Sequence, residues 1–231
     1  MKIFALADVH LSFFNSKPMD VFGPEWRNHH LLIAEKWRQL VAPKDWVLIC
    51  GDISWAMHLS EAEEDLKFIA QLPGKKVLIR GNHDYWWKSI SKVRNALPEG
   101  IQAIQNDYVP LGDIAVCGTR GWIVPNNQMS EADEKIYSRE IIRTEISLSK
   151  AEKDGFKDKI FMLHFPPFQN KLLDPGFKHL FSSYGVRWCV YGHMHGSDHR
   201  FAVEGMIDGV SYTFAAADFT GFSPVEILEI E

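Results

Sequence analysis

The amino-terminal half of this chain alternates between short apolar runs and longer segments with helical periodicity. The apolar runs have the composition of buried strands and cover residues 3–7, 46–50 and 77–80. Each is followed by a segment whose apolar residues are spaced as in an amphipathic helix. These segments span residues 27–41, 60–71 and 86–97. Ser60 and Glu63 form a capping-box pattern for the second of them. This alternation predicts a parallel sheet with helices on its faces.

The carboxy-terminal half has a different pattern. Two runs around Gly112 predict a hairpin, and a long charged segment predicts a helix over residues 130–153 that begins near Ser130. Further strands are expected at residues 160–163 and 188–191, and an antiparallel second layer at residues 201–203, 210–215 and 225–230. We therefore expect residues 1–231 to form a single α/β domain, a two-layer β-sandwich flanked by helices.

The composition argues against several classes of protein. The chain has 231 residues, of which 46% are hydrophobic and 24% charged, as in an ordinary globular domain. Its formal net charge of −5 argues against a broad basic surface, so long nucleic acid is not an expected partner. The apolar start is too short for a signal peptide, and no apolar stretch is long enough to span a membrane. The odd number of scattered cysteines (Cys50, Cys117 and Cys189) fits buried thiols in a reducing cytoplasm.

Polar motifs follow five of the apolar runs. In chain order they are Asp8-Val9-His10, Gly51-Asp52, Gly81-Asn82-His83-Asp84, His164 and Gly192-His193-Met194-His195. Aspartate, asparagine and histidine supply oxygen and nitrogen ligands to hard and borderline metals. Strands that end at one edge of a sheet bring such ligands together, which is one way to build a two-metal site.

Each motif has a structural explanation when it is taken alone. A D-x-H pair or a lone His164 is usually a polar strand end, and an isolated Asp52 is usually a cap or a turn residue. The ordered set favours a functional interpretation, in which Asp52 has two oxygens with which to bridge two metals. His83 lies next to the ligand Asn82 and is placed to donate a proton to a leaving oxygen, with Asp84 orienting its ring.

Taken in order, the motifs resemble those of the calcineurin-like metallophosphoesterase family, D-x-H, G-D, G-N-H-D, H and G-H-x-H, across residues 8–195. The resemblance implies a four-layer α/β/β/α sandwich with mixed sheets and two transition-metal ions, for which Mn, Fe and Zn all suit the ligands. The ligands of the first metal would be Asp8, His10, Asp52 and His195. Those of the second would be Asp52, Asn82, His164 and His193. A hydroxide bridging the metals would be the nucleophile, and His83 the general acid or a phosphate contact, with Asp84 its partner.

The resemblance also narrows the expected reaction. Protein Ser/Thr phosphatases of the family have an Arg-containing stretch after G-D and a G-N-H-E motif. This chain has Ile53-Ser54-Trp55-Ala56 after Asp52, and Asp84 in place of the glutamate. We expect a cytoplasmic, bacterial-type phosphohydrolase that acts on a phosphodiester or a small phosphate ester. The alternatives are a phosphomonoesterase, a nucleotide pyrophosphohydrolase, or a non-catalytic metal-binding scaffold, which would have no need of His83.

Several residues near the motifs have two interpretations each. Aromatic side chains can stack on a flat group of the substrate or pack in the core. They are Trp55, Tyr85, Trp86, Trp87 and Trp122. Arg120 can contact a phosphate oxygen or form a surface ion pair. His29 and His30 begin a predicted helix near the sheet edge, from which one of them can reach the pocket.

Overall fold

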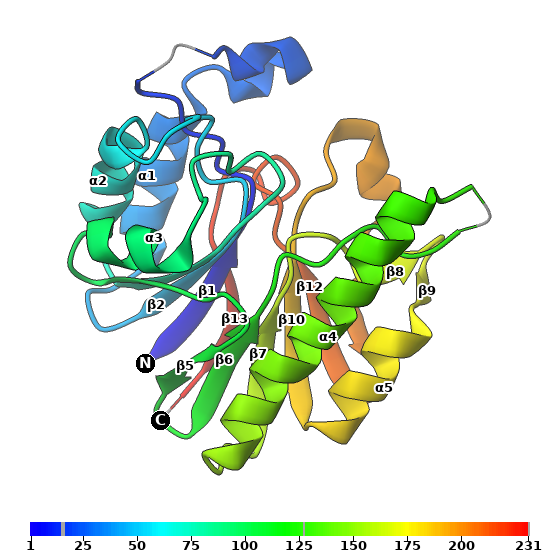
Figure 1. Cartoon of the computed structure of the whole chain (residues 1–231). Helices are drawn as coiled ribbons and strands as arrows, with labels where there is room; N and C mark the ends of the chain where they lie inside the picture. Colours follow the sequence, from blue (N-terminus) through cyan, green and yellow to red (C-terminus); the bar gives the residue numbers. More distant parts are fainter. Residues whose placement is uncertain (15–16, 127, 231) are drawn as a thin grey trace.

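Two β-sheets lie face to face in the computed structural model, which describes residues 1–14, 17–126 and 128–230. Helices cover the outer face of each sheet (Figure 1). A core of apolar side chains from both sheets, including Ala5, Leu48, Val116 and Met162, fills the space between them. The expected α/β class and the α/β/β/α order of layers are confirmed.

The first sheet has the strand order β13-β1-β2-β3-β4. These strands are Val225–Glu229, Lys2–Leu6, Trp46–Cys50, Lys75–Ile79 and Ile101–Ala103. The strands β1 to β4 are parallel, because a helix or a long connection separates each from the next, and only β13 is antiparallel. β2 is buried along its whole length, as a run of five apolar residues covered on both faces requires.

The second sheet has the order β11-β12-β10-β7-β6-β5. Its strands are Gly205–Ile207, Val210–Phe214, Val186–Tyr191, Asp158–Met162, Ile114–Gly118 and Tyr108–Leu111. The four central strands are parallel, and the two edge strands are antiparallel to their neighbours. The expected hairpin around Gly112 is confirmed as β5 and β6.

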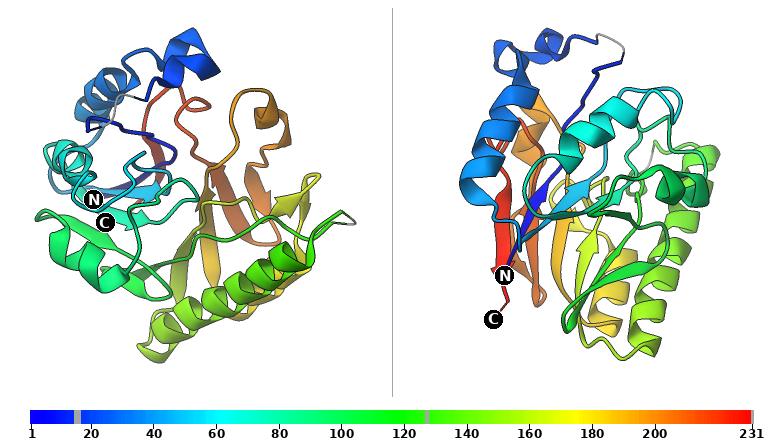
Figure 2. Two further views of the ribbon diagram at one scale, coloured as in Figure 1. Left: turned by 45° about the horizontal axis from the view of Figure 1, so that its top comes forward. Right: turned by 90° about the vertical axis from the view of Figure 1, so that its left-hand side faces the viewer.

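The helices fall into two groups, one outside each sheet (Figure 2). The first group consists of α1 (His29–Leu40), α2 (Glu63–Ala70) and α3 (Ile90–Ala96). The second consists of α4 (Glu131–Lys153) and α5 (Pro175–Ser183). Ser130 caps α4 by accepting a hydrogen bond from the backbone N–H of Asp133, as the sequence predicts. Short 3-10 helices, η1 (Met19–Phe22), η2 (Pro24–Trp26) and η3 (Gly196–Phe201), and the small hairpin of β8 (Phe168–Gln169) and β9 (Leu172–Leu173) complete the fold.

The carboxy-terminal segment differs from the expected antiparallel layer. β12 pairs in parallel with β10, whereas β13 leaves that sheet and pairs with β1 at the edge of the other. Residues 201–203 are not a strand, because η3 ends at Phe201 and β11 begins only at Gly205. Alternation along a strand indicates which side chains share a face, but it does not select the neighbouring strand.

The ends of two predicted helices also differ. α2 begins after Ala62 without a side-chain cap, so the prediction of a Ser60 capping box is wrong. α3 is shorter than the predicted residues 86–97. Trp86 and Trp87 lie in the turn before α3, where both rings are buried.

No helix among the described residues is both long enough and apolar enough to cross a membrane.

Candidate metal centre

The predicted ligands come together at the carboxyl ends of five parallel strands, at the upper edge of the sheets in Figure 1. Each strand is followed, within four residues, by one or two of them. They are Asp8 and His10 after β1, Asp52 after β2, Asn82 after β3, His164 after β7, and His193 and His195 after β10. Their donor atoms form two neighbouring clusters.

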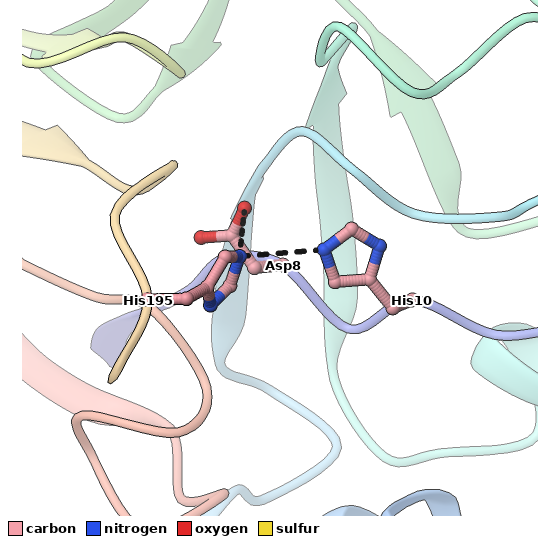
Figure 3. A group of neighbouring side chains, drawn as sticks. All are labelled: Asp8, His10 and His195. Carbon is pink, nitrogen blue, oxygen red and sulfur yellow. Dashed lines mark hydrogen bonds and ion pairs between the residues drawn. The ribbon is translucent and has the colours of Figure 1, made fainter. Parts of the chain in front are cut away.

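The first cluster consists of Asp8, His10 and His195, whose donor atoms all lie within 4.8 Å of one another. The Nε2 atom of His195 lies between the other two residues (Figure 3). It is 3.4 Å from His10 Nε2 and 3.8 Å from Asp8 Oδ1. Asp8 Oδ1 is buried and has no hydrogen-bond partner among the described residues. An unpaired carboxylate oxygen beside two imidazole nitrogens fits a cation.

The second cluster is centred on Asn82 Oδ1. This atom lies 2.6 Å from His164 Nε2 and 3.0 Å from His193 Nδ1. The two imidazole nitrogens are 3.2 Å apart. Ligands of one transition metal, each about 2.1 Å from the ion, are separated by roughly 3–3.5 Å. Two of the three separations lie in this range, and the contact between Asn82 and His164 is shorter.

Asp52 lies between the two clusters. Its Oδ2 atom is 3.8 Å from His10 Nε2 and 3.5 Å from His164 Nε2. Its Oδ1 atom accepts a hydrogen bond of 2.8 Å from the backbone N–H of His83. The side chain is almost completely buried, and this hydrogen bond fixes the orientation of the carboxylate.

The backbone at the site is held in an uncommon conformation. Asp8, His10, Asp52 and His193 all have positive φ angles, between 43° and 81°. Such angles strain a residue with a Cβ atom and are typical of functional sites. A Cβ atom at Gly81 would overlap the Asp52 carboxylate, so this motif position requires glycine.

Burial controls the protonation of the ligands. It lowers the pKa of His164 to about 3 and that of His193 to about 2, which keeps both imidazoles neutral and able to bind a metal. Burial also raises the pKa of Asp8 well above its usual value, with a smaller contribution from the Asp52 carboxylate. Burial alone would lower the pKa of His195, but the carboxylates of Asp218 and Asp8 raise it to about 9. The site therefore brings together the carboxylates of Asp8 and Asp52, and a cation would offset their charges.

The model of the calcineurin-like phosphoesterase family matches residues 1–197, which include every strand end described above. The chain belongs to this family. It is therefore a metal-dependent hydrolase of phosphate esters.

Solved structures that are similar to this phosphoesterase have little sequence identity with it. The phosphopantetheinyl hydrolase of Mycobacterium tuberculosis is 15% identical, with a TM-score of 0.60 and coverage of 99% of this chain and 96% of that one. A protein from Thermus thermophilus is 14% identical, with a TM-score of 0.52 and coverage of 84% and 81%. A protein of unknown function from Aquifex aeolicus is 15% identical, with a TM-score of 0.47 and coverage of 97% and 95%. No curated protein matches the sequence significantly.

Two contacts outside the clusters orient histidines of the phosphoesterase that are predicted to bind metal. His164 Nδ1 lies 3.0 Å from the backbone carbonyl of Cys50, and His195 Nδ1 lies 3.0 Å from Asp218 Oδ1. Such partners fix the tautomer and the orientation of a metal-binding imidazole. Asp218 was not predicted as part of the site, although it follows the apolar run of β12 much as the predicted ligands follow their strands.

The expected contact between Asp84 and the His83 ring is absent. The Asp84 carboxylate instead accepts hydrogen bonds from the backbone N–H groups of Gly81, Ile53 and Ser54, at 2.7–3.1 Å, and from the Trp86 indole at 3.0 Å. Both of its oxygens are therefore engaged, and it is buried between the loops that follow β2 and β3. Asp84 positions the backbone of the two loops rather than the His83 ring.

His83 lies at the border of the first cluster. Its ring centroid is 5.9 Å from that of His10 and 4.5 Å from that of Trp55. The Nδ1 atom is buried and has no hydrogen-bond partner among the described residues. Burial lowers the pKa of His83, and the nearby Asp52 carboxylate opposes this shift.

The aromatic residues near the motifs have different positions. Trp55 stacks on His10 with a centroid separation of 4.9 Å, and thus forms one wall of the site. Trp86 and Trp87 pack in the core, which supports the structural interpretation for both. Tyr85 is exposed, 6.1 Å from the His83 ring. The indole of Trp122 donates to Asp133.

His29 and His30 do not join the clusters. His29 is buried, with Nε2 2.9 Å from the carbonyl of Val9 and Nδ1 3.0 Å from that of Trp26. These contacts tie the start of α1 to the loop after β1. His30 packs at the edges of the Phe13 and Phe68 rings.

Proposed function

We propose that this phosphoesterase binds two metal ions and hydrolyses a phosphodiester or a small phosphate ester. The ligands of the first ion are Asp8, His10, Asp52 and His195. The ligands of the second are Asp52, Asn82, His164 and His193. The observation that carries this proposal is the position of Asp52, whose Oδ2 atom lies within 4 Å of an imidazole nitrogen in each cluster.

The proposed mechanism assigns a different task to each group. Bound cations would lower the pKa of coordinated water and stabilise the charge that develops on the phosphoryl oxygens. Asp52 keeps the ligand clusters in fixed relation, because one carboxylate belongs to both. His83 donates a proton to the leaving oxygen from Nε2, since its Nδ1 atom is buried. Trp55 supports the rings of both His10 and His83 and limits their movement.

Metal analysis tests the proposed pair of ions. Protein reconstituted with Mn²⁺ should contain two ions per chain, and a stoichiometry of one or less would contradict the proposal. Asp52→Asn keeps the shape of the side chain but removes its charge, so it should weaken the binding of both ions. Asp20→Asn is a matched control, because Asp20 is exposed and its nearest cation, Arg27, is 3.9 Å away.

Matched substrates test the proposed reaction. We expect a higher kcat/KM for a phosphodiester than for phosphoserine or phosphothreonine peptides. A doubly charged monoester gains more from an additional guanidinium than a diester does, and the stretch after Asp52 contains no arginine. There the backbone of Ile53 and Ser54 is bound to Asp84, and Trp55 covers His10. A clear preference for phosphopeptides would overturn the diester assignment, and no metal-dependent hydrolysis of either class would overturn the proposed activity.

A further inference from the structure

A second polar cavity lies along the same sheet edge as the metal clusters. It has a volume of about 200 Å³ and is lined by residues that follow β3, β4 and β6, together with residues of α4. Arg80 directly follows β3 and directly precedes the Gly81-Asn82 motif. The backbone carbonyl of Arg120 accepts hydrogen bonds of 3.0 Å from the N–H groups of His164 and Phe165. The cavity wall is thus continuous with the loops that carry two of the proposed ligands.

The cavity has an excess of positive charge. Four of its lining residues are basic, namely Arg80, Lys88, Arg120 and Arg143, and one is acidic, Glu140. Glu140 is buried and already fully engaged. Its Oε1 atom accepts from Arg143 at 2.6 Å, and its Oε2 atom accepts from Thr119 and from the backbone N–H of Gly121. Glu140 therefore pairs with Arg143, and it forms no ion pair with the other three cations.

These three cations lack protein partners. In the part of the chain that the structure describes, Arg80, Lys88 and Arg120 form no ion pair, and their side chains donate no hydrogen bond. The Nε atom of Arg80 is buried without a partner, which is costly for a charged donor. The Arg120 guanidinium also packs over the Trp122 ring, 4.5 Å from its centroid, so its position is fixed before any ligand arrives.

We propose that this cavity binds a second phosphate group of the substrate, while the metal clusters act on the first. This inference rests on the proposed phosphoesterase function and specifies its substrate class. Planar guanidinium groups match phosphate oxygens in geometry and charge. Arg80 follows β3, as Asn82 does, and the lining residues after β4 and β6 lie one strand beyond β3 and β7. Adjacent strands of a sheet are about 4.8 Å apart. The two phosphate groups would therefore be separated by roughly 5–10 Å.

Titration of chelator-treated, metal-free protein with inorganic phosphate tests whether the cavity binds phosphate, and it does not depend on turnover. Phosphate then has no metal ion to bind at the clusters, so loss of binding in the arginine variants reports on the cavity. Wild-type protein should give a saturable isotherm in calorimetry. Arg80→Gln and Arg120→Gln should weaken binding by about tenfold or more, and Arg120→Lys should restore part of it.

Arg139→Gln is the matched control for these variants. Arg139 lies on α4 one turn before Arg143, is exposed, and donates only to a carbonyl of its own helix, so the same change of net charge should leave phosphate binding intact. Thermal unfolding establishes that each variant is folded. No saturable binding by wild-type protein, or equal affinity in all folded variants, would overturn the assignment of the cavity.

A pair of chromogenic diesters tests whether the bound phosphate belongs to the substrate. The nitrophenyl ester of thymidine 5′-phosphate and its 3′-phosphorylated form differ only in the second phosphate. The phosphorylated form should have the higher kcat/KM in wild-type protein and Arg139→Gln, and this ratio should fall towards one in Arg80→Gln and Arg120→Gln. A ratio near one in wild-type protein would overturn the substrate assignment and indicate a separate site for free phosphate. Failure to hydrolyse either ester would contradict the proposed function. The phosphate titration would still decide whether the cavity binds phosphate.

Discussion

The imidazole of His195 and the carboxylate of Asp218 form a close pair, with Nδ1 and Oδ1 3.0 Å apart, although 23 residues separate them in the chain. Asp218 lies beyond residue 197, the last that the family model matches. Its second oxygen accepts a hydrogen bond from the backbone N–H of Gly196. The carboxy-terminal segment thus supports a proposed ligand, His195, that belongs to the family motif.

We expect Asp218→Asn to weaken metal binding by about 10–100-fold, because the imidazole loses the charge that orients it and raises its basicity. Competition with a chromophoric chelator measures this affinity. Asp208→Asn is the control, since Asp208 pairs with Lys178 at the surface, 2.9 Å away. Wild-type affinity in Asp218→Asn would show that the pair is not needed to hold His195.

We expect His83→Ala to retain both metals and to slow turnover of substrates with poor leaving groups by roughly 10²–10⁴-fold. The loss should be smaller for nitrophenyl esters, because a good leaving group needs less protonation. The hydrogen bond to Asp52 comes from the backbone of His83, so the substitution preserves it. Equal losses for good and poor leaving groups would contradict the role of a general acid.

We expect Asp84→Asn to lower the free energy of unfolding by about 1–3 kcal/mol, because an amide nitrogen cannot accept the hydrogen bonds that the lost oxygen accepted. Urea unfolding of the metal-free protein measures this change, and His83→Ala should alter it much less. Unchanged stability together with a kinetic defect like that of His83→Ala would instead restore Asp84 as the partner of His83.

Lys76 should make stability increase with pH in the alkaline range. Its side chain is buried and donates to the carbonyls of Ala70 and Leu72 at the end of α2, and burial lowers its pKa from 10.5 to about 8. Between these two values the unfolded chain binds the proton and the folded chain does not. Stability from this residue therefore rises as the pH increases from about 8 to 10.5, by about 2–3 kcal/mol.

Comparison of wild-type protein with Lys76→Met isolates this effect from tyrosines and cysteines that titrate in the same range. The difference in the free energy of unfolding between the two proteins should change with pH in the direction just given. A difference that stays constant from pH 7 to 10.5 would contradict the prediction.

The strands before each motif could be predicted from sequence because they are apolar runs that end in polar residues, as at Cys50 and Asp52. Parallel pairing then placed the motifs at one edge. The position of β13 could not be predicted, because its alternation fits the edge of either sheet and only the free edge of β1 selects one. Likewise, α5 was not expected, although Asp174 and Pro175 form a recognisable helix start.

The details of the site depended on contacts between distant segments. Asp84 is next to His83 in the sequence, which suggests a contact between the two side chains. In the structure the loop after β2 instead brings the backbone N–H groups of Ile53 and Ser54 to the Asp84 carboxylate. Asp218 belongs to no motif, so only the return of the chain after β12 reveals its role. The motifs of the sequence contain the proposed ligands, whereas Asp218, which contacts one of them, lies outside every motif.

The pairing of β1 with β13 brings the two chain ends together. The amino group of Met1 donates to the carbonyl of Ile230 at 2.8 Å, at the end of the sheet opposite the metal clusters (Figure 1). A short peptide joining residues 1 and 230 would therefore close the backbone into a ring without disturbing a ligand. New ends opened in an exposed connection such as the turn at Gly112 would give a circular permutant. The order of the motifs along the chain would change, while their arrangement in space would not.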